Sequence, residues 1–300
     1  MSVCLFLPES WPMTICLKSW GFSMRRLIIV SGAGLSADSG VPTFRKGAVT
    51  PLWDKYKLTE VCNIQAFDKG FHYLDDPMPP LEALSEGTDD EPSRNLYELT
   101  HEFYNMRRQE LGTVEPNIAH LRIAEWYERF PGQVVNFTTN VDDLLERAGI
   151  PHDDVIHAHG YLTEIMYRRG KDVIVEDIGY TAVDYRKYEW VKPAITFFGE
   201  TAPWYMGQIN LFDTLTTQDL VIVVGASNQV IDFNWELFPA HSRGTKVWGV
   251  NNGINYLEQS LYEERGVPVW YDTAANVFSN KHFIGQVEAW LEEKIYVPSR

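Results

Sequence analysis

A histidine followed by a glycine is the pair in this sequence best suited to acid–base chemistry. His159 precedes Gly160, and His157 stands two residues earlier. Histidine titrates near neutral pH and can accept a proton from a hydroxyl group, and the glycine leaves room beside it for a substrate. We therefore expect His159 to be a catalytic base; the alternative is a histidine that only caps a strand. We expect His157 and His152 to be structural or exposed.

A glycine-containing turn follows the first apolar run, residues 26–30. Gly32, Ala33 and Gly34 occupy this turn, and Ser36 follows in the same segment. Glycines let backbone N–H groups approach a pyrophosphate, and the N-terminus of a following helix favours its negative charge. The turn alone is equally consistent with a tight strand–helix connection. The longer string that continues through residues 37–45 is more specific.

Apolar runs alternate with amphipathic segments along the chain. Strands are predicted at residues 26–30, 133–137, 194–198, 220–224, 246–250 and 267–270. Helices are predicted at residues 95–111, 117–130, 141–148, 232–241 and 283–294. This alternation predicts an α/β fold, a Rossmann-like doubly wound parallel sheet that binds its ligand at the carboxyl ends of the strands.

Composition narrows the class of partner. The 300 residues carry a formal net charge of −15 with a pI near 4.9, which disfavours nucleic acid and favours a basic peptide. The three cysteines, Cys4, Cys16 and Cys62, are odd in number and far apart, which fits a reducing, cytoplasmic compartment. The sequence has no apolar run of 18 residues, so it predicts no membrane span. No coiled-coil heptad or interface motif appears, and we expect a monomer.

Two segments stand apart from the predicted elements. Residues 1–23 precede the first strand and are expected to form a loosely packed N-terminal extension, leaving residues 24–300 as one catalytic domain. Residues 75–94 are rich in proline, aspartate and glutamate, which predicts a solvated acidic loop.

Several motifs, in this order, resemble the sirtuin family of NAD-dependent protein lysine deacylases. Residues 31–45 resemble its glycine-rich signature, residues 138–142 its Thr-Gln-Asn-Ile-Asp segment, and residues 157–160 its His-Gly pair. Residues 192–200 resemble its Arg-Pro-x-Val-Val-x-Phe-Gly-Glu segment, and residues 224–227 and 250–251 its late Gly-Thr-Ser and Ile-Asn. The resemblance extends from residue 25 to about residue 277.

The resemblance implies NAD as cofactor and an acylated lysine as substrate. The acyl oxygen would attack the ribose as nicotinamide leaves, and His159 would then activate a ribose hydroxyl, giving O-acyl-ADP-ribose. Asn140 would orient the ribose or a water, Asp142 would hydrogen-bond the nicotinamide amide, and Phe44 would shield the ribose carbon. Asp142 is also consistent with a first-turn helix acid. The cofactor-binding residues implied are Gly32, Ala33, Gly34, Ser36, Phe44, Arg45, Trp53, Thr139, Asn140, Asp142, Gly225, Ala226, Ser227 and Asn251.

A second resemblance concerns the acyl group. Tyr104 and Arg107 match the Tyr-x-x-Arg segment of the sirtuin branch that prefers malonyl and succinyl groups, and Thr43 is typical of that branch. Helical i, i+3 spacing puts the phenol and the guanidinium on one face, where they can bind a carboxylate. The alternative is an ordinary solvated helix. In relatives, the segment matching Phe198 and Gly199 lines the acyl-lysine tunnel.

Two departures from the family leave the reaction open. Residues 161–191 lack the cysteines of the usual zinc ribbon, so we expect no metal in the small module at about residues 161–192. It would be held by packing of Ile165, Tyr167, Val173, Ile174, Tyr180 and Tyr185. Thr139 replaces the family's glutamine and gives up one contact. We expect the chain to be a deacylase. The alternatives are an NAD hydrolase or ADP-ribosyltransferase, and an NAD-sensing module with weak catalysis.

Overall fold

The computed structural model describes residues 24–42, 56–72, 74, 95–200, 211–227, 232–253 and 256–293. The predicted N-terminal extension and acidic loop lie outside these ranges, as do Thr43, Phe44, Arg45 and Trp53.

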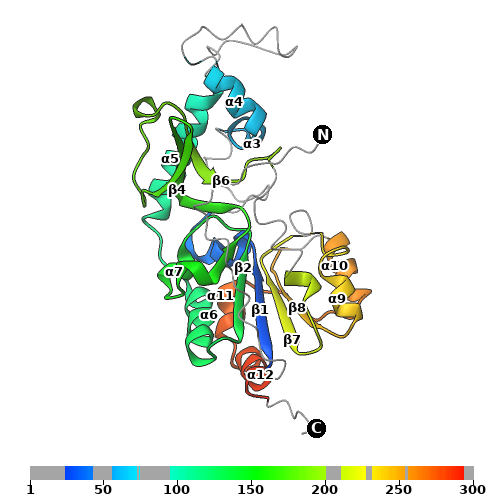
Figure 1. Ribbon diagram of the computed structural model, residues 1–300. Coiled ribbons are helices and arrows are strands. Elements are labelled where there is room, and N and C mark those ends of the chain that lie inside the picture. The colour runs from blue at the N-terminus through cyan, green and yellow to red at the C-terminus, as the bar shows by residue number, and fades with distance from the viewer. Residues whose placement is uncertain are drawn as a thin grey trace.

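A six-stranded parallel sheet forms the larger part of the molecule, in the order β3-β2-β1-β7-β8-β9 (Figure 1). The register brings Ser31, Thr138 and Val224 level at the carboxyl ends of the three central strands. The turns that leave these strands therefore meet at one edge of the sheet. The strands are β1 (Arg26–Ser31), β2 (Val134–Thr138), β3 (Val155–His157), β7 (Asp219–Val224), β8 (Lys246–Val250) and β9 (Val269–Trp270).

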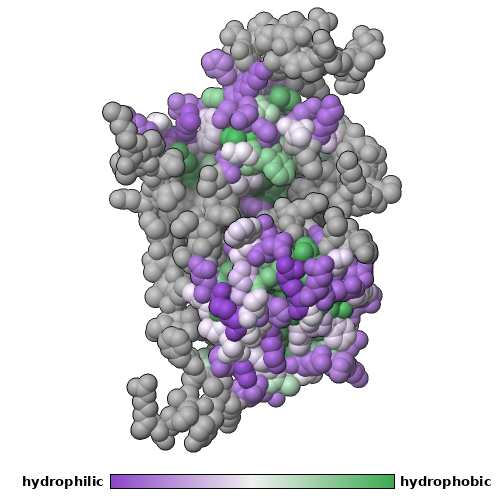
Figure 2. All heavy atoms as spheres, turned by 90° about the vertical axis from the view of Figure 1, so that its right-hand side faces the viewer, coloured by the Kyte–Doolittle hydropathy of each residue, from purple (hydrophilic) through white to green (hydrophobic). Residues whose placement is uncertain are grey.

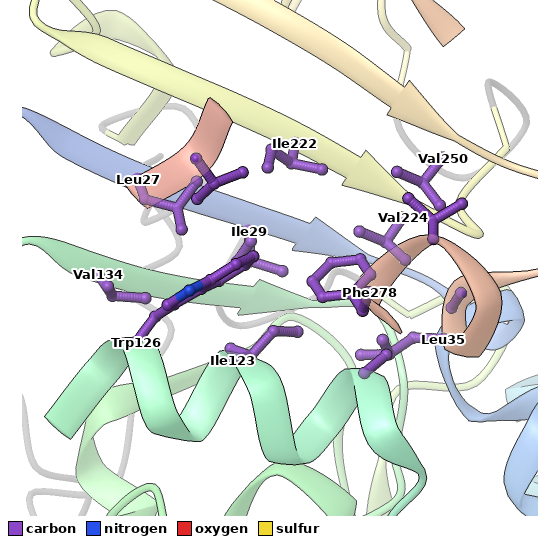
Figure 3. Packing of buried hydrophobic residues seen from close by; sticks show 14 of the residues in the cluster. Leu27, Ile29, Leu35, Ile123, Trp126, Val134, Ile222, Val224, Val250 and Phe278 are labelled. Carbon is purple, nitrogen blue, oxygen red and sulfur yellow. The ribbon is translucent and has the colours of Figure 1, made fainter. Parts of the chain in front are cut away.

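Helices cover both faces of this sheet, which confirms the predicted doubly wound fold. On one face, Trp126 and Phe278 pack against Leu27, Ile29 and other strand residues (Figure 3). Full burial of each such side chain contributes about 1.5–3 kcal/mol. The helices of this face are α6 (Ile118–Arg129), α11 (Ala274–Ser279) and α12 (Lys281–Glu292), and those of the other are α9 (Phe238–Ser242) and α10 (Tyr256–Glu263).

A smaller module lies above the carboxyl edge of the large sheet in Figure 1. Its antiparallel sheet has the order β5-β4-β6 and packs with three helices through a second, aromatic-rich core. The strands are β4 (Gly160–Arg169), β5 (Asp172–Asp177) and β6 (Val191–Ile195), and the helices are α3 (Leu58–Val61), α4 (Ile64–His72) and α5 (Leu96–Leu111).

Short helical turns complete the described fold. They are α1 (Ala33–Ser36), η1 (Ala37–Ser39), α7 (Leu144–Arg147), η3 (His152–Asp154) and η4 (Tyr185–Lys187). None of the described helices is long and apolar enough to span a membrane. On the face shown in Figure 2, hydrophilic side chains cover most of the coloured surface in the lower half, and hydrophobic ones form only small spots there.

Three predicted elements need correction. The apolar run at 194–198 was expected in the large sheet, but β6 pairs antiparallel with β4 in the small one, where it is buried against the module's own core. The helix expected at 141–148 is only α7, because residues 141–143 stay unwound. The helix expected at 232–241 is only α9, because Asp232 accepts a hydrogen bond from the Asn234 amide and forms a separate turn.

Candidate active site

The turns that follow β1 and β7 pack backbone against backbone at the carboxyl edge of the large sheet. The Gly32 amide donates to Val224 O (2.9 Å), and the Gly34 amide donates to Gly225 O (3.1 Å). The glycines therefore also serve the close approach of the two turns, beside the pyrophosphate contact expected of this segment. A Cβ at Gly34 would lie 2.5 Å from Gly225 Cα, and Gly225 itself has φ +57°.

This contact predicts a stability effect at Gly34. Gly34→Ala forces the two turns apart, and we expect it to lower the free energy of unfolding by about 2 kcal/mol or more. Urea unfolding measures the change. Gly285 in α12 is the matched control because a Cβ there meets nothing within 4 Å. Gly285→Ala should stabilise by about 0.5–1 kcal/mol, since alanine is the better helix former. Equal stability of Gly34→Ala and the wild type would contradict the packing account.

Ser36 lies beneath the first turn at the centre of a buried hydrogen-bond network. Its Oγ lies 3.3 Å from His120 Nε2 and 3.2 Å from Asn140 Nδ2, and the hydroxyl also hydrogen-bonds Asp142. His120 Nδ1 accepts from the Asn117 amide, so Nε2 carries the ring proton. Burial lowers the pKa of His120 to about 3, which keeps the ring neutral. The network therefore orients Ser36 towards both predicted site residues.

Asn140 is held from every side. Its Nδ2 also donates to Gly32 O (3.1 Å), and its backbone amide donates to Thr138 Oγ1 (3.0 Å). Its carbonyl accepts from His157 Nδ1 at 2.9 Å, and His157 Nε2 lies 2.9 Å from Glu146 Oε1. His157 is thus structural and buried, as expected, but it supports the site directly. Sequence reasoning missed Glu146 and His120 as supporting residues.

His159 lies two residues beyond the end of β3, and one of its ring nitrogens is hydrogen-bonded. Its Nδ1 lies 3.0 Å from Thr139 O, a carbonyl that can only accept, so Nδ1 carries the proton and Nε2 is the basic nitrogen. Burial lowers the pKa of His159, and the hydrogen bond to Thr139 partly opposes this. The imidazole is therefore neutral at pH 7 and able to accept a proton.

Thr139 stands where the Thr-Gln-Asn-Ile-Asp segment has glutamine, and its side chain is turned towards the sheet. Its amide and hydroxyl both donate to Ser31 O, at 2.9 and 3.3 Å. The hydroxyl therefore fixes the turn that presents His159 and Asn140.

Asp142 lines a pocket that lies between the two modules. Its carboxylate accepts from the Leu144 amide, so it also acts as a helix-start acid. Burial raises its pKa, and the Ser36 hydrogen bond and His157 oppose the rise. The described residues that line this pocket are Ala33, Gly40, Val41, Pro42, Arg107, Glu110, Leu111, Val114, Asn140, Val141, Asp142 and Leu162.

The two predicted acyl-binding residues of α5 have different surroundings. Arg107 lines the pocket, and its Nη1 lies 3.6 Å from Glu110 Oε2. Tyr104 is outside the pocket lining: its hydroxyl lies 3.0 Å from Cys62 Sγ and its ring stacks on Phe197. Burial raises the pKa of the Cys62 thiol to about 11, so the thiol stays protonated. Both α5 side chains are buried, which excludes the alternative of an ordinary solvated face.

Phe198 and Gly199 form an exposed rim beside α4. Phe198 is 62% exposed, and its backbone pairs with the start of α4 through the Cys62 carbonyl (2.7 Å) and the Ile64 amide (3.1 Å). Gly199 has φ +90°, which favours glycine.

An ion pair between a buried lysine and a partly exposed glutamate holds the backbone beside this rim, and sequence reasoning missed it. Lys192 Nζ lies 2.9 Å from Glu200 Oε2, and the same carboxylate oxygen accepts from the Phe197 amide (2.6 Å). The Lys192 ammonium also donates to Ile195 O (2.5 Å). A lysine inside an otherwise apolar strand, eight residues before a glutamate, was the available signal.

Ala226, Ser227 and Asn251 lie beyond β7 and β8. Asn251 Nδ2 donates to Ala226 O at 3.2 Å, which ties the two strand ends together. The structure therefore gathers the described cofactor-binding candidates along one edge of the large sheet. Among the described residues, no group of three or more His, Cys, Asp or Glu side chains is placed to hold a metal ion.

Comparisons with known proteins agree with this architecture. Residues 81–232 match the model of the Sir2 family. An NAD-dependent protein deacylase of Helicobacter hepaticus is 35% identical over 264 residues, which cover 80% of this chain and 91% of the relative. A second such deacylase, from Campylobacter jejuni, is 34% identical over 213 residues, covering 69% and 76%.

Solved structures of Sir2 homologues share the fold. A homologue in complex with NAD aligns with a TM-score of 0.60 at 25% identity, covering 92% of this chain and 94% of that one. A homologue in complex with ADP-ribose aligns with a TM-score of 0.64 at 24% identity, covering 93% and 98%.

Proposed function

Because this chain belongs to the Sir2 family and is an NAD-dependent protein deacylase, we propose that it transfers the acyl group of a modified lysine to ADP-ribose with His159 as base. One observation carries the assignment of the base: the Nδ1 atom of His159 is committed to Thr139 O, which leaves Nε2 as the proton acceptor. Nicotinamide and O-acyl-ADP-ribose would be the products.

NAD supplies, when bound, a ribose carbon that is activated by its nicotinamide leaving group. The buried amide of Asn140 and the carboxylate of Asp142 offer hydrogen bonds at the inner end of the site, next to Ala33. At the other end, Gly225, Ala226, Ser227 and Asn251 would hold the adenosine half. Phe44, Arg45 and Trp53 are proposed to bind NAD from the resemblance alone.

The acyl-lysine would enter over Phe198 and Gly199, and its acyl end would reach Arg107. The Lys192–Glu200 ion pair supports this route, because it holds the backbone of the Phe197 segment in place. Arg107 is the cation of the described pocket lining, which favours acyl groups that end in a carboxylate, such as succinyl and malonyl. The Tyr104 hydroxyl would have to leave Cys62 to join this contact.

NAD hydrolysis or ADP-ribosyl transfer is a second reaction that the same site could carry out. The Thr139 hydroxyl, turned to Ser31 O, cannot replace the contact of a glutamine amide with the ribose, and this favours weaker control of the reacting sugar. Nicotinamide release with and without an acyl-lysine peptide tests the two. Release that depends on the peptide supports the deacylase, and equal release in its absence supports the hydrolase.

The small module is expected to be stable without zinc. Ile165, Val183 and Val191 form its core, and Tyr167 and Tyr185 pack against them. Ile165, Tyr167 and Tyr185 were predicted to pack here. Val173 was also predicted, but it is 38% exposed. Elemental analysis of the purified protein should therefore find no stoichiometric zinc, and a chelator should leave the melting temperature unchanged. One equivalent of zinc would contradict this proposal.

A further inference from the structure

Glu110 stands one helical turn beyond Arg107 and shares its pocket. We propose that Glu110 is a specificity-determining residue. By forming an ion pair with the Arg107 guanidinium, it competes with the carboxylate of an acidic acyl group and weakens the binding of that group. The inference rests on the proposed deacylase function, and it concerns the degree to which that site selects a charged acyl group.

The geometry places both side chains at the same point of the pocket. Glu110 Oε2 lies 3.6 Å from Arg107 Nη1, and i, i+3 spacing puts both on one face of α5. Both residues line the pocket that also contains Asn140 and Asp142. An acyl carboxylate that reaches Arg107 therefore meets Glu110 at the same guanidinium.

The charge balance of the pocket points the same way. Its described lining carries two carboxylates, Glu110 and Asp142, against the single guanidinium of Arg107. Most of the remaining lining is apolar, so these charges are poorly screened. Burial lowers the pKa of Arg107, and Glu110 is the largest of the charges that oppose this. An acidic acyl group would add a third carboxylate to this lining.

The two partners differ in their freedom to move. The Arg107 side chain is 10% exposed, whereas that of Glu110 is 44% exposed. Glu110 can therefore swing towards solvent when an acyl carboxylate arrives, at the cost of its ion pair. A neutral acetyl group leaves the pair intact. Glu110 thus reduces the advantage of succinyl-lysine over acetyl-lysine without abolishing it.

Replacing Glu110 tests this directly. Glu110→Gln keeps the shape and removes the charge, and we expect the ratio of kcat/KM for succinyl- over acetyl-lysine peptide to rise about three- to tenfold. Glu110→Ala should raise it as well, which excludes an effect of the new amide. Glu115→Gln is the matched control: it removes the same charge from a side chain that is 82% exposed and paired with Arg147. Its ratio should equal that of the wild type.

The possible results separate this inference from the function on which it rests. A wild-type enzyme that turns over acyl-lysine, with a ratio that is unchanged or lower in both Glu110 variants, would overturn the role of Glu110 alone. A wild-type protein that releases no acyl group from any acyl-lysine peptide would overturn the deacylase function, and this inference with it. Melting temperatures of the variants exclude loss of fold as the cause.

Discussion

His159→Ala is expected to lower acyl transfer by about 10²- to 10⁴-fold, the range typical for loss of a general base. The structure gives the reason: the protonated Nδ1 is fixed on Thr139 O, so Nε2 is the nitrogen able to take a proton. The ring is only partly buried, so its removal should leave the fold intact. Turnover and circular dichroism of the variant measure both expectations.

The pH dependence gives a second check on the same residue. Burial lowers the pKa of His159 from its ordinary value of 6.5, so the basic form persists below that pH. In the wild type, kcat/KM should fall only as the pH drops below about 6.5, because protonation of Nε2 removes the base. His152→Ala is the control, since that histidine is exposed and stacks on Tyr161. Near wild-type turnover in His159→Ala would show that the base is another group.

Arg107→Met is expected to reduce kcat/KM for succinyl-lysine about ten- to a hundredfold more than for acetyl-lysine. Methionine keeps an apolar stem and removes a charge-assisted contact worth about 1.5–3 kcal/mol. Because the net charge of the protein is −15, the global field opposes an acidic acyl group, and the preference must come from this local cation. Salt should therefore change the ratio only weakly.

Two controls accompany this variant. Lys187→Met removes one positive charge from a side chain that is 77% exposed, and it should leave the substrate ratio unchanged. The melting temperature of Arg107→Met must be measured, since the side chain it replaces is buried. Equal losses on the two substrates would place Arg107 outside acyl recognition and leave only the general deacylase function.

The large sheet could be predicted because its strands are apolar on both faces. Short apolar runs such as residues 26–30 and 220–224 are typical of strands that are buried on both faces of a parallel sheet. The order of the motifs indicated the same fold. The run at 194–198 is equally apolar, but sequence alone does not say which sheet buries it. The strand at Val155–His157 was missed because three residues are too short to show a period.

The candidate site was predictable in its residues more than in its contacts. Motif order located Asn140, Asp142 and His159. The supporting contact of Ser36 with His120 joins residues 84 positions apart, and that of His157 with Glu146 joins a strand to the short helix α7, so neither follows from a sequence motif. The spacing of Tyr104 and Arg107 predicted a shared face. It could not show that the Tyr104 hydroxyl contacts Cys62, because that contact depends on packing between α5 and the residue that follows α3. The i, i+3 spacing of Arg107 and Glu110 was a readable signal for their ion pair and was missed.

The most direct test of this account is the identity of the product formed from NAD and an acyl-lysine peptide. Mass spectrometry of the reaction with succinyl- and acetyl-lysine peptides should find nicotinamide, free-lysine peptide and O-acyl-ADP-ribose in equal amounts. The same product should be nearly absent with His159→Ala. Bare ADP-ribose formed with the acyl peptide left intact, or ADP-ribose attached to protein, would contradict acyl transfer and identify a hydrolase or ADP-ribosyltransferase.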